Sequence, residues 1–143
     1  MKILLSTFLT IVSGSLVFIV GQIVVECYVK PMQEYKSIKS EISYILVYYA
    51  NVFMNPVNKA EDNFFTDTWQ TLYDEASKEL RIAASKLAGF KQRKPFFVKK
   101  DKVEMAQSAL IGLSNGLFTS DVFRQVERNE KMRREICEGL NLK

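Results

Sequence analysis

Histidine is absent from all 143 residues of the chain. Its absence removes the most common general base and the most common transition-metal ligand. It also excludes Ser-His-Asp and Cys-His catalytic sites. The sequence contains neither a GxxxxGK[ST] phosphate-binding loop nor a Rossmann fingerprint. We therefore expect a protein that is not an enzyme and has no cofactor and no metal. A membrane-surface enzyme built on converging Lys, Asp or Glu side chains is the least favoured alternative.

Cysteine, proline and glycine are scarce, with two, three and six copies respectively. Cys27 and Cys137 lie far apart, without the spacing of metal ligands, which fits a reducing compartment and no disulfide framework. The low proline and glycine content argues against a disordered or fibrous chain. The net charge of +4 is mild. It suits a protein beside an anionic leaflet and does not by itself indicate nucleic-acid binding.

One long apolar run stands out, because no charged residue occurs between Lys2 and Glu26. At about 1.5 Å per residue, a helix over 3–25 is about 35 Å long and crosses a hydrocarbon core of about 30 Å. The apolar region of a signal peptide is shorter, about 7–15 residues. Ser13-Gly14-Ser15 resembles a cleavage site, but five further apolar residues follow it. We interpret 1–26 as a retained transmembrane anchor.

The charges that flank the run predict its orientation. Lys2 and the amino terminus precede it, whereas Lys30, Lys36 and Lys39 follow it. Basic residues beside a span favour the cytoplasmic side. We expect a single-pass protein of a bacterial inner membrane whose C-terminal domain, 27–143, is cytoplasmic. Those residues suffice for one small domain and not for two.

Apolar residues beyond the anchor recur at spacings of three and four, which is typical of helices. The first predicted helix runs from near Pro31 to Asn55-Pro56, and it continues the anchor as a stalk if Pro31 only kinks it. The second begins at Thr66 or Asp67 and ends at Gly89. The third and fourth cover about 101–115 and 121–140. The fold class is therefore all-α, with an N-terminal single transmembrane helix followed by a cytosolic bundle of about four helices.

Local signals refine the helix ends and the faces expected in the core. We expect Gly89 to be a C-cap, and Asp101 and Glu104 to form a capping box. Asn115-Gly116 is expected to end the third helix, and Thr119, Ser120 or Asp121 to cap the fourth. Trp69 and Phe123 are assigned to apolar faces. The charged stretch 124–136 is expected to be a solvated or partner-facing surface.

Small residues in the anchor form one narrow stripe at helical spacing. Small side chains at i and i+4 let helix backbones approach closely in lipid, so this stripe is a candidate oligomerisation surface. Small residues are also common in membrane helices that do not associate. A ring closed around the side of Ser6, Thr10 and Ser13 would have a polar lumen. The predicted oligomerisation residues are Ser6, Thr10, Gly14, Val17 and Gly21.

The stretch KQRKPFFVKKDK, 91–102, is expected to be a basic loop with two aromatic rings. We rank docking of both rings into the bundle first, contact with anionic lipid second and nucleic acid third. The candidate lipid- or phosphate-contacting residues are Lys91, Arg93, Lys94, Phe96, Phe97, Lys99, Lys100 and Lys102.

Two further stretches are interpreted mainly as packing surfaces. Alanines in 80–90 allow close helix contact, and Arg81 is expected to pair with an acidic neighbour or, less favourably, an acidic ligand. The glycines in 110–118 could expose backbone to a ligand, although a tightly packed helix end is the more common role.

These features together predict a non-enzymatic membrane scaffold or interaction module that self-assembles through its transmembrane helix and its helical domain. Its expected partners are membrane lipid, further copies of itself and a possible cytosolic protein. One alternative is a pore-forming or membrane-perturbing effector, for example in bacterial anti-phage defence. The other is a membrane-tethered nucleic-acid binder, which is less favoured.

Overall fold

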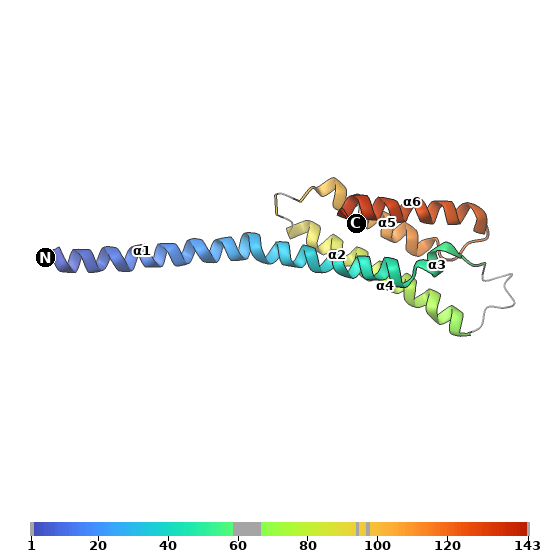
Figure 1. Ribbon diagram of the computed structural model, residues 1–143, viewed down its shortest axis with the longest axis horizontal. Helices are drawn as coiled ribbons and strands as arrows, with labels where there is room; N and C mark the ends of the chain where they lie inside the picture. Colours follow the sequence, from blue (N-terminus) through green and yellow to red (C-terminus); the bar gives the residue numbers. More distant parts are fainter. Residues whose placement is uncertain (1, 59–66, 94, 97, 143) are drawn as a thin grey trace.

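The computed structural model describes residues 2–58, 67–93, 95, 96 and 98–142. These residues form helices and contain no strand, so the all-α prediction is confirmed. A long apolar helix projects from a bundle of shorter helices (Figure 1). The elements are α1 (Lys2–Val24), the π-helical turn η1 (Val25–Val29), α2 (Lys30–Tyr48), α3 (Ala50–Met54), α4 (Asp67–Arg93), α5 (Lys100–Asn115) and α6 (Val122–Leu140).

The helix that contains α1 does not stop at Pro31. It runs without a break from Ile3 to Tyr48, over 46 residues, so the stalk alternative is correct. Proline normally disrupts a helix because its ring meets the carbonyl of the residue four positions earlier. For Pro31 that residue is Cys27, which lies in η1, where the N–H of Lys30 bonds to the carbonyl of Val25. The wider turn makes room for the proline ring.

α2 buries one face in the bundle and is interrupted at Tyr49. Its buried side chains are Ile38, Ile42, Ile45 and Leu46. At Tyr49 the backbone turns (φ −97°, ψ 18°) before α3, which ends at Asn55, ahead of Pro56, as predicted. Val52 and Phe53 of α3 are also buried, so the short helix extends the core beyond the interruption.

α4 is longer than predicted, because it passes through Gly89 and ends at Arg93. The assignment of Gly89 as a C-cap is therefore wrong. Phe90 directly follows it and is completely buried, so the packing of this ring continues the helix past the glycine. Trp69, which the sequence places on the apolar face of this helix, is 54% exposed in the first turn of α4. That prediction is also wrong, because the first turn extends past the packed part of the bundle (Figure 1).

The ends of α5 and α6 follow the sequence signals in part. Lys99 is the N-cap of α5 and no side chain caps it, so the predicted capping box of Asp101 and Glu104 is wrong. Both acids lie inside the helix. The other end of α5 is confirmed, with Gly116 as the C-cap. α6 is capped by Asp121, whose carboxylate accepts a hydrogen bond from the backbone N–H of Arg124 at 3.3 Å.

α6 contributes fewer apolar residues to the core than expected. Ile136 and Leu140 are buried, but Phe123 is 94% exposed, which corrects its assignment. The charged stretch is largely solvated, as predicted, and it also carries two buried polar residues, Gln125 and Asn129.

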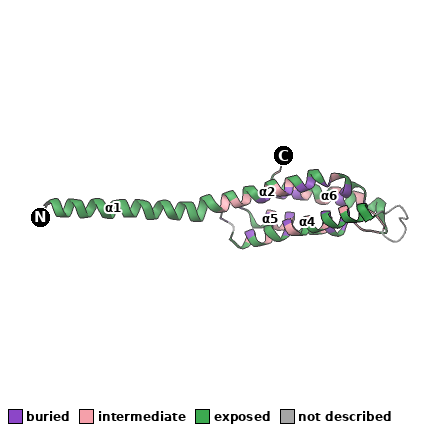
Figure 2. Cartoon of the chain, turned by 90° about the horizontal axis from the view of Figure 1, so that it is seen from below, coloured by how far each residue is buried: buried purple, intermediate pink, exposed green. Residues whose placement is uncertain are grey.

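The helices alternate in direction, and this alternation gives the bundle two distinct ends. α2 leads away from α1, α4 returns, α5 leads away again and α6 returns (Figure 1). α4 packs against α2 and α5, and α5 packs against α6. Buried residues lie along the helices of the bundle, whereas α1 is exposed along its length (Figure 2). We call the end nearest α1 the anchor end and the opposite end the far end.

The far end is closed by backbone and amide hydrogen bonds. The N–H of Val57 bonds to the carbonyl of Leu117 at 3.0 Å. The completely buried side chain of Asn129 donates to the carbonyls of Phe53 at 2.9 Å and Gly116 at 3.2 Å. Its oxygen accepts from Gln125 at 2.9 Å. These bonds join α3, α6 and the turn after α5.

Candidate functional site

The predicted oligomerisation stripe lies on α1, which touches no other helix of the bundle. All five stripe residues are exposed. A Cβ added at Gly14 or Gly21 would meet no atom within 4 Å. The stripe is therefore open to a neighbouring helix along its whole length, and its role in assembly stays a prediction.

The hydroxyl groups on α1 bond to their own helix. The hydroxyl of Thr10 donates to the carbonyl of Ser6 at 3.0 Å, and that of Ser13 donates to the carbonyl of Thr10 at 3.0 Å. Bonds of this kind satisfy the hydroxyl donor inside lipid without a partner chain. A polar lumen lined by these groups stays a prediction.

Polar side chains mark the point where the apolar surface ends. Gln22 donates to Glu26 at 3.2 Å, and Lys30 forms an ion pair with the same carboxylate. Tyr28 is 47% exposed on the next turn, at a position typical of residues at a membrane interface. The edge of a span over residues 3–25 therefore coincides with η1.

A second unpartnered surface lies on α2 and was missed by the sequence analysis. Tyr44, Val47 and Tyr48 are 62%, 75% and 60% exposed, and the two tyrosine rings stack at 5.4 Å. We call these three residues the α2 patch. Their spacing of i, i+3 and i+4 was the available signal, because it describes a second apolar face beside the one assigned to the core.

The predicted basic loop is mostly not a loop. Lys91 and Arg93 form the last turn of α4, Lys99 caps α5, and Lys100 and Lys102 lie within α5. The connection between the helices is short and lies at the anchor end (Figure 1). The predicted contacts of Lys94 and Phe97 lie outside the described residues.

Most basic residues of this stretch have acidic partners. Arg93 pairs with Glu34 of α2 at 2.8 Å, and Lys102 pairs with Glu138 of α6 at 2.5 Å. Glu104 accepts from Lys91 at 3.3 Å and lies 3.8 Å from Lys100. In the part of the chain that the structure describes, Lys99 is the one basic residue of the stretch without an ion pair.

Docking of Phe96 into the bundle was ranked first, and this prediction is wrong. The ring is 89% exposed. Its neighbours Pro95 and Val98 are buried instead, and the N–H of Val98 bonds to the carbonyl of Pro95 at 3.1 Å. The turn is therefore stabilised by this hydrogen bond and by the burial of Pro95 and Val98, while Phe96 points away from the core.

Arg81 has a structural role different from the expected acidic pair. Its guanidinium donates to the hydroxyl of Ser114 at 3.0 Å and to the side-chain oxygen of Asn115 at 2.9 Å. Ser77 and Ser114 share a hydrogen bond of 2.9 Å. These contacts join α4 to the end of α5.

The glycine-rich end of α5 is a packing surface, which confirms the more common of its two roles. A Cβ at Gly112 would lie 2.7 Å from the sulfur of Met132, and one at Gly116 would lie 2.2 Å from the amide of Gln125. Both glycines thus admit side chains of α6.

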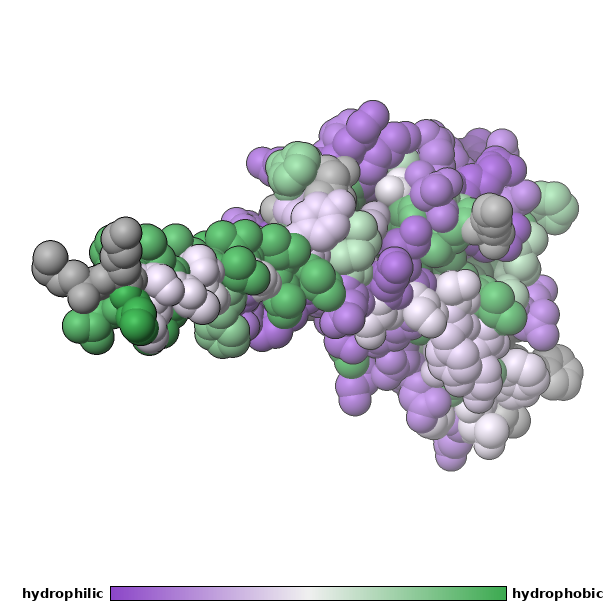
Figure 3. Space-filling model, turned by 60° about the vertical axis from the view of Figure 1, so that its left-hand side comes forward, coloured by the Kyte–Doolittle hydropathy of each residue, from purple (hydrophilic) through white to green (hydrophobic). Residues whose placement is uncertain are grey.

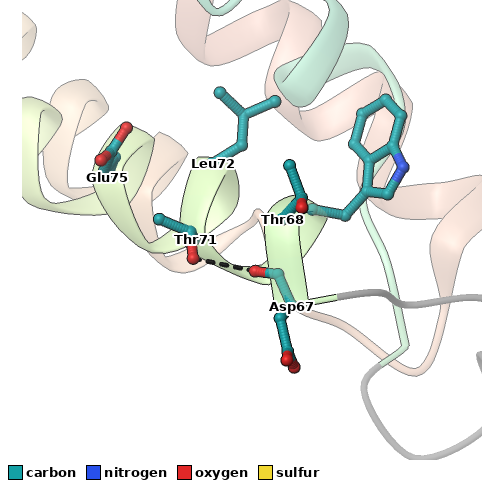
Figure 4. A pocket seen from close by; sticks show the side chains of 6 residues that line it. Asp67, Thr68, Thr71, Leu72 and Glu75 are labelled. Carbon is teal, nitrogen blue, oxygen red and sulfur yellow. Dashed lines mark hydrogen bonds between the residues drawn. The ribbon is translucent and has the colours of Figure 1, made fainter.

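The pockets at the far end are shallow. One, of about 570 Å³, is lined only by the first turns of α4, where Thr71 donates to the carbonyl of Asp67 at 2.8 Å (Figure 4). Another, of about 630 Å³, lies between α3, α4 and α6 beside Phe123. Neither brings together three metal-binding side chains, and the described residues contain no such group.

Burial raises the pKa of the Tyr35 hydroxyl, whose ring stacks on Phe90 at 5.0 Å. Together with the ring stack, this burial makes Tyr35 a packing residue of the bundle.

Comparison with known proteins gives no match to a family model, to a curated protein or to a solved structure.

Proposed function

We propose that this chain is a non-enzymatic, single-pass membrane protein that assembles with further copies of itself and serves as a scaffold or interaction module. The observation that carries the proposal is the unbroken helix Ile3–Tyr48, which bears an uncovered apolar segment and continues directly into the core of the bundle. A protein partner of the bundle is part of the proposal.

Membrane insertion is favoured by the surface of α1. The helix is long and apolar enough to cross a membrane, and none of its apolar window is buried. A signal sequence shares these properties, but the apolar run here exceeds the usual length of about 7–15 residues. Since the same helix also supplies core residues such as Ile38 and Ile42, the anchor and the bundle are one continuous structural unit.

Self-assembly is favoured by two uncovered surfaces on one straight helix. Copies that share a membrane have the same orientation, so identical surfaces lie at identical heights. Val47 lies about 33 Å beyond Val25 at about 1.5 Å per residue, too far to touch the bilayer. The α2 patch therefore lies outside the bilayer at the same height in every copy, where it is open to a neighbouring copy in addition to the small residues of α1.

The absence of an activity is favoured by how the polar groups are used. Arg81, Ser77 and Ser114 bond one another, and Asn129 bonds backbone carbonyls. These hydrogen bonds hold helices together, and an open pocket of about 630 Å³ beside Ser77 and Arg81 is lined by residues of α4 alone. On the face of the bundle that Figure 3 shows, hydrophilic side chains lie among pale and hydrophobic areas.

We further propose that the membrane is a bacterial inner membrane and that the bundle is cytoplasmic, because Lys30, Lys36 and Lys39 follow the span. A reporter fused to the C-terminus that is active only in the cytoplasm tests this orientation. Activity of a matched periplasmic reporter at the same position would reverse it.

The mass of the intact chain in a lipid disc or mild detergent tests assembly. A defined multiple of the 16.5 kDa monomer that persists on dilution is expected. A monomer at every protein-to-lipid ratio would contradict self-assembly and leave α1 as a tether.

A further inference from the structure

The anchor end carries an excess of positive charge. Among the described residues of 26–39, 91–104 and 138–142, eight side chains are basic and five are acidic. Five of these eight basic residues form ion pairs, with Glu26, Glu34, Glu104 or Glu138. The basic residues that form no ion pair within the described chain are Lys36, Lys39 and Lys99.

An aromatic ring projects from the same end. Phe96 is 89% exposed, whereas Pro95 and Val98 on either side are buried and fix the turn that carries it. A large ring held in water by a well-packed turn exposes apolar surface that a bilayer interface can accept. Lys99, three residues further on, is also exposed.

The height of this end places it beside the headgroups. Arg93 pairs with Glu34, which lies nine residues after Val25 and thus about 13 Å along the helix axis. The headgroup layer extends about 5–8 Å beyond the hydrocarbon core. At the level of Glu34 and Arg93 the remaining gap is comparable to the Debye length of about 8 Å, so charges near this level are only partly screened from the surface.

We propose that the anchor end is a second membrane contact, in which Phe96 enters the headgroup layer and Lys36 and Lys99 bind anionic lipid. The inference rests on the proposed function only in that α1 spans the bilayer. The partner is the leaflet at which α1 ends, because the same helix holds this surface close to it in every copy. The bundle then rests on the membrane instead of standing clear of it.

Tryptophan fluorescence in lipid discs tests the contact. Trp69 is the only tryptophan of the chain. The full-length variant Trp69→Phe/Phe96→Trp therefore reports on one position. In discs that contain brominated phosphatidylglycerol, this tryptophan is expected to lose most of its fluorescence.

The matched control is Trp69→Phe/Phe123→Trp. Phe123 is 94% exposed, close to the value for Phe96, but it lies at the far end of the bundle. It is expected to keep its fluorescence in the same discs. Equal quenching at the two positions, or none at either, in protein that remains in the disc would overturn the proposal.

Charge reversal separates lipid binding from mere proximity. Lys36→Glu/Lys99→Glu is introduced into the Trp69→Phe/Phe96→Trp variant. It is expected to lower the quenching of this tryptophan in discs of brominated phosphatidylglycerol to the level found in discs of brominated phosphatidylcholine. Lys78→Glu/Arg128→Glu, which changes charge by the same amount away from the anchor end, is expected to leave it unchanged. Loss of quenching in both double variants would remove the specific role of Lys36 and Lys99.

The same samples distinguish this surface from assembly and from nucleic-acid binding. Retention in the disc tests the span and the mass tests assembly, and neither depends on quenching of Phe96→Trp. The outcome that would favour nucleic acid has two parts. In anionic discs the brominated lipid does not quench the tryptophan of Phe96→Trp, and a single-stranded oligonucleotide protects it from quenching by iodide. That result would assign the surface to nucleic acid and overturn the lipid proposal.

Discussion

Arg93, the last residue of α4, donates a hydrogen bond to Glu34 of α2 across 2.8 Å, and so joins the returning helix to the one that leaves α1. Exposed pairs of this kind contribute only about 0–1 kcal/mol. The neighbouring stack of Tyr35 on Phe90, with ring centroids 5.0 Å apart, adds buried apolar contact at the same level. The ion pair and the ring stack together attach the end of α4 to the first turns of α2.

Charge on the α2 patch is expected to weaken assembly. Val47→Glu places a carboxylate on a side chain that is 75% exposed, so the bundle itself should remain as stable as before. Between copies the same carboxylates would face each other and repel. Native mass spectrometry in lipid discs should show a shift toward monomer. The control is Ser108→Glu, at an exposed position of α5. Equal dissociation of both variants would exclude the patch as an interface.

Enlargement of the α1 stripe is expected to weaken contact within the membrane. Gly14→Leu adds a branched side chain where helix backbones would otherwise approach closely. Ser15→Leu makes a comparable change at the next residue, about 100° further around α1 and off the stripe, and should not alter the association of copies. Energy transfer between labelled copies in vesicles measures both variants. If the Gly14 variant associates as strongly as the unmodified chain, the small residues of α1 are not the interface.

Loss of the Asn129 side chain is expected to destabilise the far end. Asn129→Ala leaves the carbonyls of Phe53 and Gly116 without their amide donor in a buried site. The expected decrease in the free energy of unfolding is about 2 kcal/mol. Urea unfolding followed by Trp69 fluorescence measures it. Asn51→Ala, at an exposed position, should change stability by less than about 0.5 kcal/mol, and similar losses for both would contradict the assigned role of Asn129.

Two glycine substitutions are expected to have opposite effects. Gly89→Ala should raise the free energy of unfolding by about 0.5–1 kcal/mol, because Gly89 lies inside α4 and a Cβ there meets nothing within 4 Å. Gly139→Ala should lower it by about 1–3 kcal/mol, since its Cβ would lie 2.6 Å from the carbonyl oxygen of Lys102. The same unfolding measurement ranks them. Destabilisation by Gly89→Ala would restore Gly89 as a helix end.

The all-α fold could be predicted because the sequence signals for helices are local. Apolar spacing identified the buried face of α2, and Asn55-Pro56, Gly116 and Asp121 marked helix ends that the structure contains. The predictions for Gly89 as a helix end and for Trp69 on an apolar face are wrong because tertiary packing overrides local preference at both positions. Packing of Phe90 continues α4 beyond the glycine, and the first turn of α4 passes beyond the core, so local preference does not decide either position.

The candidate site was less predictable because its character depends on partners distant in sequence. Lys91, Arg93 and Lys102 read as a basic patch, yet their acids come from α2, α5 and α6. Pro95 and Val98 are buried and Phe96 is exposed, and the sequence alone does not decide which of these apolar residues the turn buries. The α2 patch had a readable spacing, but α2 presents two apolar faces and only the packing shows which one is covered.

The uninterrupted passage from α1 through η1 into α2 has a mechanical consequence. A helix without a hinge acts as a lever, so a tilt of its membrane half displaces the half outside. Tyr48 lies 23 residues beyond Val25, about 35 Å at about 1.5 Å per residue. A tilt of about 20°, the ordinary average for membrane helices, moves it sideways by about 12 Å. The thickness of the bilayer, by setting that tilt, would then adjust how far apart neighbouring bundles lie.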